Sequence, residues 1–327
     1  MDNSSWKRIQ KLRQSYLDAK AYLPDYWQDD ELLLAYDETL AQRIRWKWRA
    51  VLEALPVPVS ELPKTIVDWG CGSGGASREL LHLHPESFEK VVLLDRSTRA
   101  VKFAARKVKD EHPKITIDSK VPSSAEPFLL LISHVLSELP DEELKKLLPL
   151  LRKASHILWV ESGRPQESRK LSALREDLRD THVFLAPCPH QNICGMLSAG
   201  QEENWCHFKA PVPKEVHLSA FWREASKQLG FDLRSLPVAY LFAQARTLSL
   251  ALPSNDRVRI LGGSRQFKGY TRFHACHISG IVQADFMKRK SKKIYEALAE
   301  PALDSLYEHR ELFSSESGED ESDAKVE

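Results

Sequence analysis

The pattern of hydrophobic and polar positions changes once along the chain. In "DDELLLAYDETLAQRIRWKWRAVLEAL", residues 29–55, apolar residues recur at helical spacing on a charged background, and residues 4–55 as a whole read as helical. "PVPVSELP" follows, and its three prolines end that pattern. We therefore expect an N-terminal helical region and linker over residues 1–60, in which Trp46 and Trp48 pack against the core.

After the linker, short apolar runs alternate with amphipathic segments. Strand candidates such as "TIVDW", "KVVLLD", "FLLLIS" and "HILWV" are separated by helical patterns such as "TRAVKFAARKVKDEH" and "DEELKKLLPLLRKA". This alternation predicts an α/β fold with a parallel, doubly wound sheet. Further on, we expect a helix over 219–231 and strands over 237–245 and 270–280.

A glycine-rich turn follows the first of these strands, in "IVDWGCGSGGASREL". Glycines there let the backbone adopt positive φ and approach a ligand where a Cβ would clash. Gly-Ala-Ser follows the last glycine in place of Gly-Lys-Ser/Thr, which excludes a P-loop. Asp95 ends the next strand, where an acid accepts hydrogen bonds from ribose hydroxyls. These residues leave dinucleotide binding and S-adenosylmethionine binding open.

The turn resembles the first motif of class I methyltransferases, in which an acid precedes glycines at alternate positions. In that family the acid lies near the methionine amino group and the glycines pass beneath the cofactor. The resemblance implies a Rossmann-like methyltransferase sheet that binds S-adenosylmethionine. The residues expected to bind the cofactor, including one at the end of the fourth strand, are Asp68, Gly70, Gly72, Gly74, Asp95 and Ser133.

Charge and targeting signals add two expectations. The formal net charge is +1, but residues 314–327 carry six acids against one lysine, so residues 1–313 are mildly basic and compatible with a nucleic-acid partner. We expect the acidic tail to be disordered. The sequence shows neither a secretory signal nor a membrane-spanning apolar stretch, which predicts a cytoplasmic protein whose thiols stay reduced.

Four of the five cysteines form a second candidate site. Cys188, Cys194, Cys206 and Cys276 offer soft thiolate ligands, which select zinc or iron-sulfur clusters. The short C-x-x-C gaps of a zinc ribbon are missing. Since buried free cysteines are common, their spacing alone leaves metal binding and plain packing open.

Several longer stretches resemble the mitochondrial small-ribosomal-subunit methyltransferase-like proteins and their bacterial relatives, over about residues 20–280. They are "ISHVLSELPDEEL", "WVESGRPQESRKLSALREDL", "APCPHQNIC" and "WCHF". The resemblance implies a four-iron four-sulfur (4Fe-4S) cluster held by Cys188, Cys194, Cys206 and Cys276. The chain departs from the family pattern at Ser162, where the family has Glu-Pro-Gly, and at Gly195, where it has proline.

Zinc is the alternative to the cluster, since His190 and His207 lie beside the expected ligands and are residue types that complete zinc sites. With four cysteines available, we interpret both histidines as supporting or packing residues. In our interpretation the cysteines are gathered because a strandless insertion over 181–217 needs a metal centre to hold it together.

The sequence assigns no catalytic residue. The Asn/Asp-Pro-Pro-Tyr/Phe motif of base-directed amino methyltransferases is absent after the fourth strand, where "SHVLSELP" stands. Ser133, His134 and Glu138 are the only candidates there, and we favour the interpretation that they shape the cofactor pocket or cap the next helix. Pro187-Cys188 resembles a cytosine carbon-5 nucleophile, but Cys188 belongs to the cysteine set.

Two functions therefore remain. One is S-adenosylmethionine-dependent methylation of small-subunit (16S-type) ribosomal RNA. The other is a non-catalytic ribosome assembly factor with a vestigial or regulatory cofactor site; a zinc-stabilised methyltransferase of another substrate is a variant of the first. Scattered basic stretches favour contact with RNA phosphates, and we expect a monomer away from the ribosome.

The expected organisation has six parts. It comprises 1–60, the helical region and linker; 61–180, the cofactor-binding core; 181–217, the cysteine-rich insertion; 218–285, the C-terminal part of the same sheet; 286–313, a helical extension; and 314–327, the tail.

Overall fold

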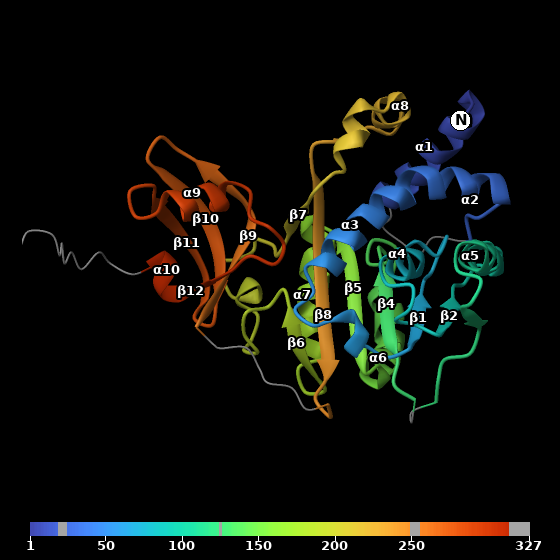
Figure 1. Cartoon of the computed structure of the whole chain (residues 1–327), viewed down its shortest axis with the longest axis horizontal. Helices are drawn as coiled ribbons and strands as arrows, with labels where there is room; N and C mark the ends of the chain where they lie inside the picture. Colours follow the sequence, from blue (N-terminus) through green and yellow to red (C-terminus); the bar gives the residue numbers. More distant parts are fainter. Residues whose placement is uncertain (19–24, 124–125, 249–255, 314–327) are drawn as a thin grey trace, which may run out of the picture.

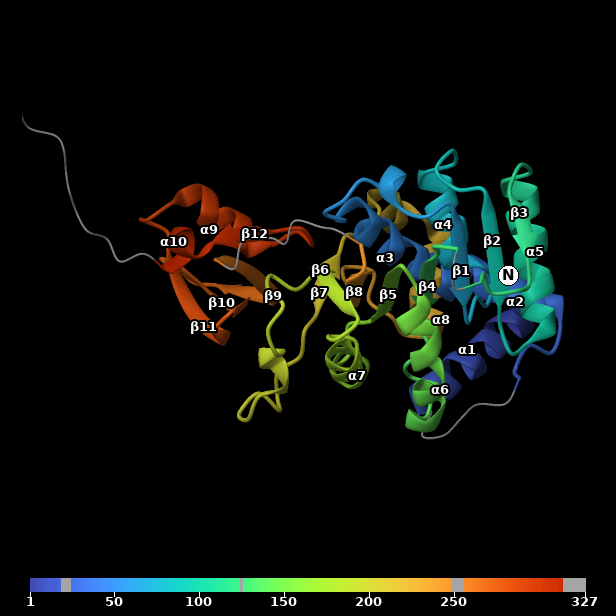
Figure 2. The same cartoon turned by 90° about the horizontal axis from the view of Figure 1, so that it is seen from below.

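Two sheets organise the molecule. The computed structural model describes residues 1–18, 25–123, 126–248 and 256–313. The larger sheet has eight strands in the order β3-β2-β1-β4-β5-β8-β6, with β7 also paired to β8. A four-stranded sheet lies beyond the β6 end of it (Figures 1 and 2). The acidic tail predicted to be disordered lies outside the described residues.

Five parallel strands confirm the predicted parallel α/β core. They are β1 (Thr65–Trp69), β2 (Lys90–Leu94), β3 (Thr116–Asp118), β4 (Leu129–Ser133) and β5 (His156–Ser162). β4 lies at the centre and its residues from Leu129 to Ile132 are fully buried. The reason is that helices cover both faces, so a central strand reads as a continuous apolar run.

Helices form the layers above and below this sheet. α3 (Gln42–Glu53), α4 (Gly75–Leu83) and α5 (Thr98–Glu111) pack on one face. α6 (Asp141–Lys153) and α7 (Pro165–Asp177) pack on the other. Trp46 and Trp48 of α3 are buried in the first of these cores, as predicted.

The N-terminal region is helical as predicted, but it is divided into separate elements. α1 (Asn3–Asp18) precedes α2 (Asp30–Tyr36), which continues through the π-helical turn η1 (Asp37–Ala41) into α3. α1 and α2 share a small core with α5 and with α8 (Ala220–Leu229). Among the described residues, no helix has the length and apolar character needed to cross a membrane.

β8 (Leu236–Ala245) corrects the expectation of a wholly parallel sheet. It runs antiparallel to β5 on one side and to β6 (His182–Ala186) on the other. β7 (Phe208–Ala210) pairs with it as well, and the short turns η3 (Gly195–Leu197) and η4 (Lys214–Leu218) flank β7 in the chain. The segment 181–217 is therefore not strandless, because "HVFLA" is a buried strand that completes the sheet.

The C-terminal region also differs from expectation. β9 (Arg257–Gln266), β10 (Tyr270–His277) and β11 (Gly280–Met287) do not extend the large sheet but form the second one, with β12 (Leu306–Glu308). β8 already has partners along both edges, so no edge is left there for β9. The stretch 286–313 holds α9 (Lys292–Ala299) and α10 (His309–Phe313), as predicted, and β12, which was not predicted.

A buried charge network ties the N-terminal region to the core. Arg78 of α4 is 3% exposed and bonds Asp37 of η1 at 2.7 Å. The same guanidinium bonds Glu111 at the end of α5 at 2.5 Å. Because the Asp37 carboxylate is itself buried, its charge needs compensation, which comes mainly from this arginine, since Lys107 Nζ is farther away, at 4.0 Å.

Replacing Arg78 with alanine is expected to destabilise the protein by ~3–5 kcal/mol, because it removes the nearest positive partner of the buried Asp37 carboxylate. Arg106→Ala is the matched control, because Arg106 pairs with Asp30 on the surface, where both side chains are about half exposed. That variant is expected to lose less than ~1 kcal/mol. Denaturant unfolding measures both; equal losses would contradict the network's role.

Candidate functional site

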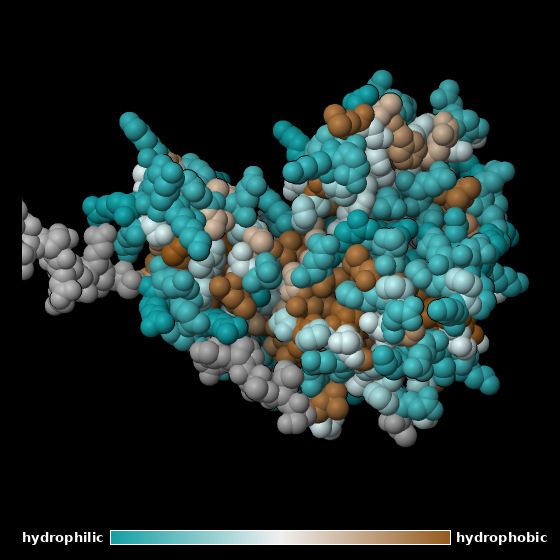
Figure 3. Space-filling model, in the orientation of Figure 1, coloured by the Kyte–Doolittle hydropathy of each residue, from teal (hydrophilic) through white to brown (hydrophobic). Residues whose placement is uncertain are grey.

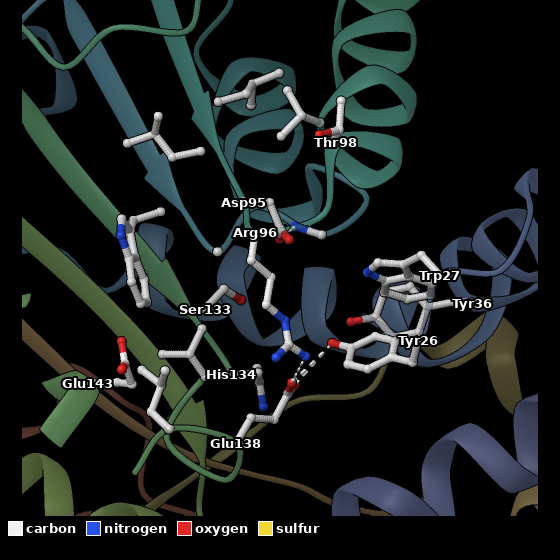
Figure 4. Close-up of a pocket in the computed structure, with 18 of the residues that line it drawn as sticks. Tyr26, Trp27, Tyr36, Asp95, Arg96, Thr98, Ser133, His134, Glu138 and Glu143 are labelled. Atoms are coloured by element: carbon white, nitrogen blue, oxygen red, sulfur yellow. Dashed lines mark hydrogen bonds and ion pairs between the residues drawn. The ribbon is translucent and has the colours of Figure 1, made fainter. Parts of the chain in front are cut away.

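A cavity of about 600 Å³ opens at the carboxyl ends of β1, β2 and β4. In an open α/β sheet this edge is where ligands bind. The N-terminal region closes the cavity on one side (Figure 4). Its lining residues include Tyr26, Trp27, Tyr36, Trp69, Gly70, Gly72, Asp95, Arg96, Ser133, His134 and Glu138.

The glycine turn has the conformation that its sequence predicted. Gly70, Gly72 and Gly74 have φ of +69°, +51° and +77°. A Cβ on Gly70 would lie 2.9 Å from Val135 Cγ1, whereas the Cβ position of Gly72 has nothing within 4 Å. Gly72 thus leaves open space at the floor of the cavity, where a ligand can approach the backbone.

Asp95 connects the turn to the next strand. Its Oδ2 accepts a hydrogen bond from Gly72 N at 3.0 Å, and its Oδ1 accepts one from Ser97 N at 2.9 Å. Burial raises the pKa of Asp95, and these backbone donors oppose the rise. Each oxygen keeps a further lone pair, so the carboxylate can also accept hydrogen bonds from a ligand in the cavity.

Asp68 and Gly74 lie behind the cavity wall and do not line it. Gly74 caps α4, where a Cβ would approach Ala104 Cβ at 3.1 Å. Asp68 is fully buried, and its Oδ2 accepts from Ser77 N at 3.3 Å. Its Oδ1 has no partner, and burial raises the pKa of this carboxyl to about 6. Oδ1 is therefore a hydrogen-bond acceptor without a donor, and it lies directly beneath the glycine turn.

The loop after β4 is held from behind by Glu161, which the sequence analysis missed. Its carboxylate accepts hydrogen bonds from Val135 N, Leu136 N and Trp159 Nε1 at 2.8–3.1 Å. Burial raises the pKa of Glu161 to about 7. The acidic residue in "WVESG" was a visible signal, but only the fold shows that it faces the loop.

Two catalytic candidates lie at the start of this loop. Ser133 Oγ accepts a hydrogen bond from Trp48 Nε1 at 2.8 Å. His134 has φ of +53°, which is uncommon outside glycine. Its buried Nε2 has no hydrogen-bond partner. Burial, with smaller effects from Lys47 and Arg43, lowers the pKa of His134 well below its usual range, so the imidazole is neutral.

Glu138 contacts the N-terminal region across the cavity. Tyr26 Oη donates a hydrogen bond to Glu138 Oε2 at 3.1 Å, and Arg96 lies 3.7 Å from the same oxygen (Figure 4). Burial raises the pKa of Glu138 to about 7, although Tyr26 and Arg96 oppose the rise. Tyr26, Trp27 and Tyr36 were not predicted here, since their distance in sequence hides the contact.

The four cysteines of the second candidate site come together between the two sheets. Burial raises the pKa of the Cys206 thiol well above its usual range, and the neighbouring Cys188, Cys194 and Cys276 raise it further. His190 Nε2 lies 3.5 Å from Cys276 Sγ. Cys71 is separate, because it is buried in the glycine turn. Within the described ranges, no three His, Cys, Asp or Glu residues are arranged to hold a single metal ion.

Two buried arginines accompany these thiols. Arg175 of α7 is 2% exposed and interacts with Cys188, and its Nη2 donates to His190 O at 3.1 Å. Arg259 of β9 is also buried and donates to Pro187 O at 2.9 Å. Both guanidinium groups oppose the rise in the pKa of Cys276. Glu176 pairs with Arg175 and accepts a hydrogen bond from Cys194 N, so the pocket contains two guanidinium groups and one carboxylate next to four potential thiolates.

Close backbone approaches explain the glycine at one point of departure from the family pattern, Gly195, and the glycine that follows the other, Gly163. A Cβ on Gly195 would lie 3.0 Å from Gly280 Cα, in the turn between β10 and β11. A Cβ on Gly163 would lie 2.6 Å from Val238 N of β8. Backbone atoms of Gly280 and Val238 thus occupy the space that a side chain at these two positions would need.

The strand order, the glycine turn and the acid beside it define a protein of the class I methyltransferase fold. The sequence profile of the family described as mitochondrial small ribosomal subunit Rsm22 matches residues 39–244. The chain belongs to this family, which confirms the resemblance seen in the sequence. No curated protein matches the sequence.

Several solved structures are distantly similar. The plantazolicin methyltransferase BamL has a TM-score of 0.41 at 13% identity, over 74% of this chain and 97% of that one. A Pyrococcus horikoshii protein described as a candidate RNA methyltransferase has a TM-score of 0.37 at 13% identity, over 72% and 98%. An S-adenosylmethionine-dependent methyltransferase from Aquifex aeolicus has a TM-score of 0.34 at 19% identity, over 46% and 87%.

Glu138→Gln is expected to make stability less dependent on pH. The folded protein retains the Glu138 proton up to pH about 7, whereas the unfolded chain releases it near pH 4.5. The stabilisation of the folded protein that comes from this retained proton is fully present below pH 4.5 and is lost as the pH rises through 7. The variant should therefore match the wild type near pH 4 and exceed it by ~2 kcal/mol near pH 8. Denaturant unfolding at both pH values measures the difference; the same difference at both would contradict the assignment.

Proposed function

We propose that the protein binds S-adenosylmethionine in the cavity and acts on the small ribosomal subunit as a methyltransferase-like protein. The observation that carries this proposal is the hydrogen bond from Gly72 N to Asp95 beneath the cavity of about 600 Å³. It joins the two elements that a nucleoside needs, an open backbone turn and a ribose-binding acid.

The residues present fit this cofactor. Asp95 is placed to accept from ribose hydroxyls, and Gly70 and Gly72 form the floor. The unpartnered Oδ1 of Asp68 supports its expected role toward the methionine amino group, acting from behind the turn with Gly74. Ser133 lines the cavity next to them. The bound cofactor would supply a methyl group activated by its sulfonium.

His134 is the residue best suited to take up the acceptor's proton. Its imidazole is neutral, its Nε2 is unpartnered, and it lines the same cavity. A neutral histidine nitrogen is the usual form of a general base, and the lowered pKa of His134 makes it a weak one. An unpartnered imidazole at the cavity is the feature that favours an enzyme over an assembly factor with a vestigial cofactor site. The missing Asn/Asp-Pro-Pro-Tyr/Phe motif leaves the methylated atom unspecified.

The family description supports the small ribosomal subunit as the partner. We propose its RNA, of the 16S type, as the substrate, because residues 1–313 are basic once the acidic tail is set aside. The cytoplasmic location and the monomeric state away from the ribosome stay predictions from the sequence.

We also propose that Cys188, Cys194, Cys206 and Cys276 hold a 4Fe-4S cluster. Cysteine thiolates are the usual ligands of such clusters, and Cys188 lies close enough to the other three thiols to raise the pKa of each. Arg259, and Arg175 together with its partner Glu176, lie beside the thiolates, and both guanidinium groups would offset part of their negative charge.

Asp95→Ala is expected to weaken S-adenosylmethionine binding at least about tenfold, because it removes a charged acceptor of hydrogen bonds. Isothermal titration with the full chain measures this. Asp110→Ala is the control, because Asp110 is exposed on α5 outside the cavity. Undiminished binding by the Asp95 variant, or no binding by the wild type, would contradict the proposed site.

Cys188→Ser is expected to lose iron and sulfide from anaerobically purified protein and to lower its stability, since the cluster ties the 187–207 loop to β10. Cys71→Ala is the control and should retain both. Iron, sulfide and zinc analysis separates the metals: zinc without sulfide would favour the zinc alternative. Absence of both metals from the wild type, with an equally stable Cys188 variant, would contradict any metal site.

A further inference from the structure

The second sheet carries a concentration of positive charge. Residues 257–293 contain ten lysines and arginines against one acid, Asp285. Arg259 is buried, and the other nine basic side chains are partly or fully exposed. The next acidic residues along the chain lie in 296–311, outside this basic stretch. On the face shown in Figure 3, the surface of this part, at the left, is largely hydrophilic.

One face of this sheet has a core and the opposite face is partly uncovered. Phe273 of β10 and Phe286 of β11 pack with Leu298 of α9 and Leu312 of α10. Residues of β10 and β11 that alternate with these face the other way. Near the large sheet, that second face is covered, because Cys276 and Ile281 pack against the main core. Toward the β9–β10 turn, Met287 is 40% exposed.

The β9–β10 turn carries a stacked aromatic pair on the surface. Phe267 and Tyr270 have ring centroids 4.5 Å apart and planes within 8° of parallel. Phe267 N donates to Tyr270 O at 2.9 Å, so the two rings flank a tight two-residue turn. Phe267 is 38% exposed. A large aromatic side chain in this position contributes little to a core.

Arg272 is fixed beside the stack. Its guanidinium carbon lies 5.8 Å from the Phe267 centroid and 5.7 Å from the Tyr270 centroid. Because these distances are almost equal, the guanidinium lies at the common edge of the pair and does not cover an outer ring face. Two hydrogen bonds of 2.8 Å to Asp285 hold it there. The pair is therefore ordered, and Phe267, which is 38% exposed, keeps ring surface available for stacking.

Basic residues surround this pair. Arg265 is the cross-strand neighbour of Arg272, and Lys268 lies within the turn. Lys288 N donates to Gly269 O at 2.9 Å, which brings the "KRKSKK" stretch to the same end of the sheet. Flat aromatic rings bordered by lysine and arginine match the stacked bases and phosphates of single-stranded nucleic acid.

We propose that the β9–β10 turn, with Phe267, Tyr270 and the surrounding basic side chains, is a base-stacking site for single-stranded RNA. Resting on the proposed ribosomal function, the site would be a contact with an unpaired RNA segment, separate from the cofactor cavity. A base stacks on the Phe267 ring, and Arg265, Lys268 and Lys288 contact the neighbouring phosphates. Duplex RNA is not a ligand of the stacking surface, since its bases are already stacked and paired.

Fluorescence anisotropy of a labelled single-stranded oligoribonucleotide with the full chain tests the site. Phe267→Ala and Phe267→Leu are expected to weaken binding about five- to hundredfold, because stacking is lost. Phe267→Trp should bind as tightly as the wild type. Leu218→Ala is the control, since Leu218 is 83% exposed but lies elsewhere on the surface. Thermal unfolding checks that each variant folds.

Salt dependence separates stacking from charge. Phe267→Leu should weaken binding by a similar factor at every salt concentration. A double variant, Lys268→Gln with Lys288→Gln, should reduce the slope of log affinity against log salt by about 1.4, for two lost phosphate contacts on a single strand. Unchanged single-strand binding by Phe267→Leu would overturn the site. An equal loss for duplex RNA or for an acidic peptide would overturn it too, by showing a site not specific to unpaired bases.

S-adenosylmethionine titration of the same proteins distinguishes this site from the proposed function. Phe267→Leu should bind the cofactor like the wild type, because Phe267 lies outside the cavity. If the wild type binds no cofactor but Phe267→Leu still loses RNA, the cofactor proposal fails and the stacking site stands. If the wild type binds the cofactor and Phe267→Leu binds single-stranded RNA as tightly as the wild type, the stacking site fails and the cofactor proposal stands.

Discussion

Strand β8 is hydrogen-bonded along both edges, and the rest of the molecule is arranged around it. It pairs with β5 from His156 to Ser162 on one side. On the other side it pairs first with β7 and then with β6. Val238 of β8 pairs with Ser162 and with Phe208, so β7 lies on the edge that β6 also uses. This antiparallel strand thus joins β6 and β7 to the parallel part of the methyltransferase sheet.

This arrangement brings the cysteines together. β6 ends opposite Phe242 and β7 begins opposite Val238, four positions away along the same edge of β8. The loop between them therefore leaves the sheet and returns at neighbouring points, which brings Cys188 and Cys206 close. Because β8 has no free edge, β9 and β10 form their own sheet, whose Cys276 lies against the same loop.

The cavity could be predicted in part. Gly70, Gly72 and Asp95 line it, as their motif indicated, because a strand followed by a glycine turn has one favoured geometry. Tyr26 and Glu161 could not be found in this way. Tyr26 contacts Glu138 across 112 positions of sequence, and Glu161 supports its loop from the adjacent strand. Neither belongs to a local motif, so only packing shows their roles.

The sequence by itself determined the elements whose cause is local. Apolar periodicity gave β1 to β5 and their covering helices, and glycine chemistry gave the turn at the cofactor end. Only the tertiary structure decided the direction of β8, the separate C-terminal sheet and the meeting of four distant thiols. Strand direction and edge occupancy depend on hydrogen bonds to distant partners, and a pattern read along one segment carries no record of those partners.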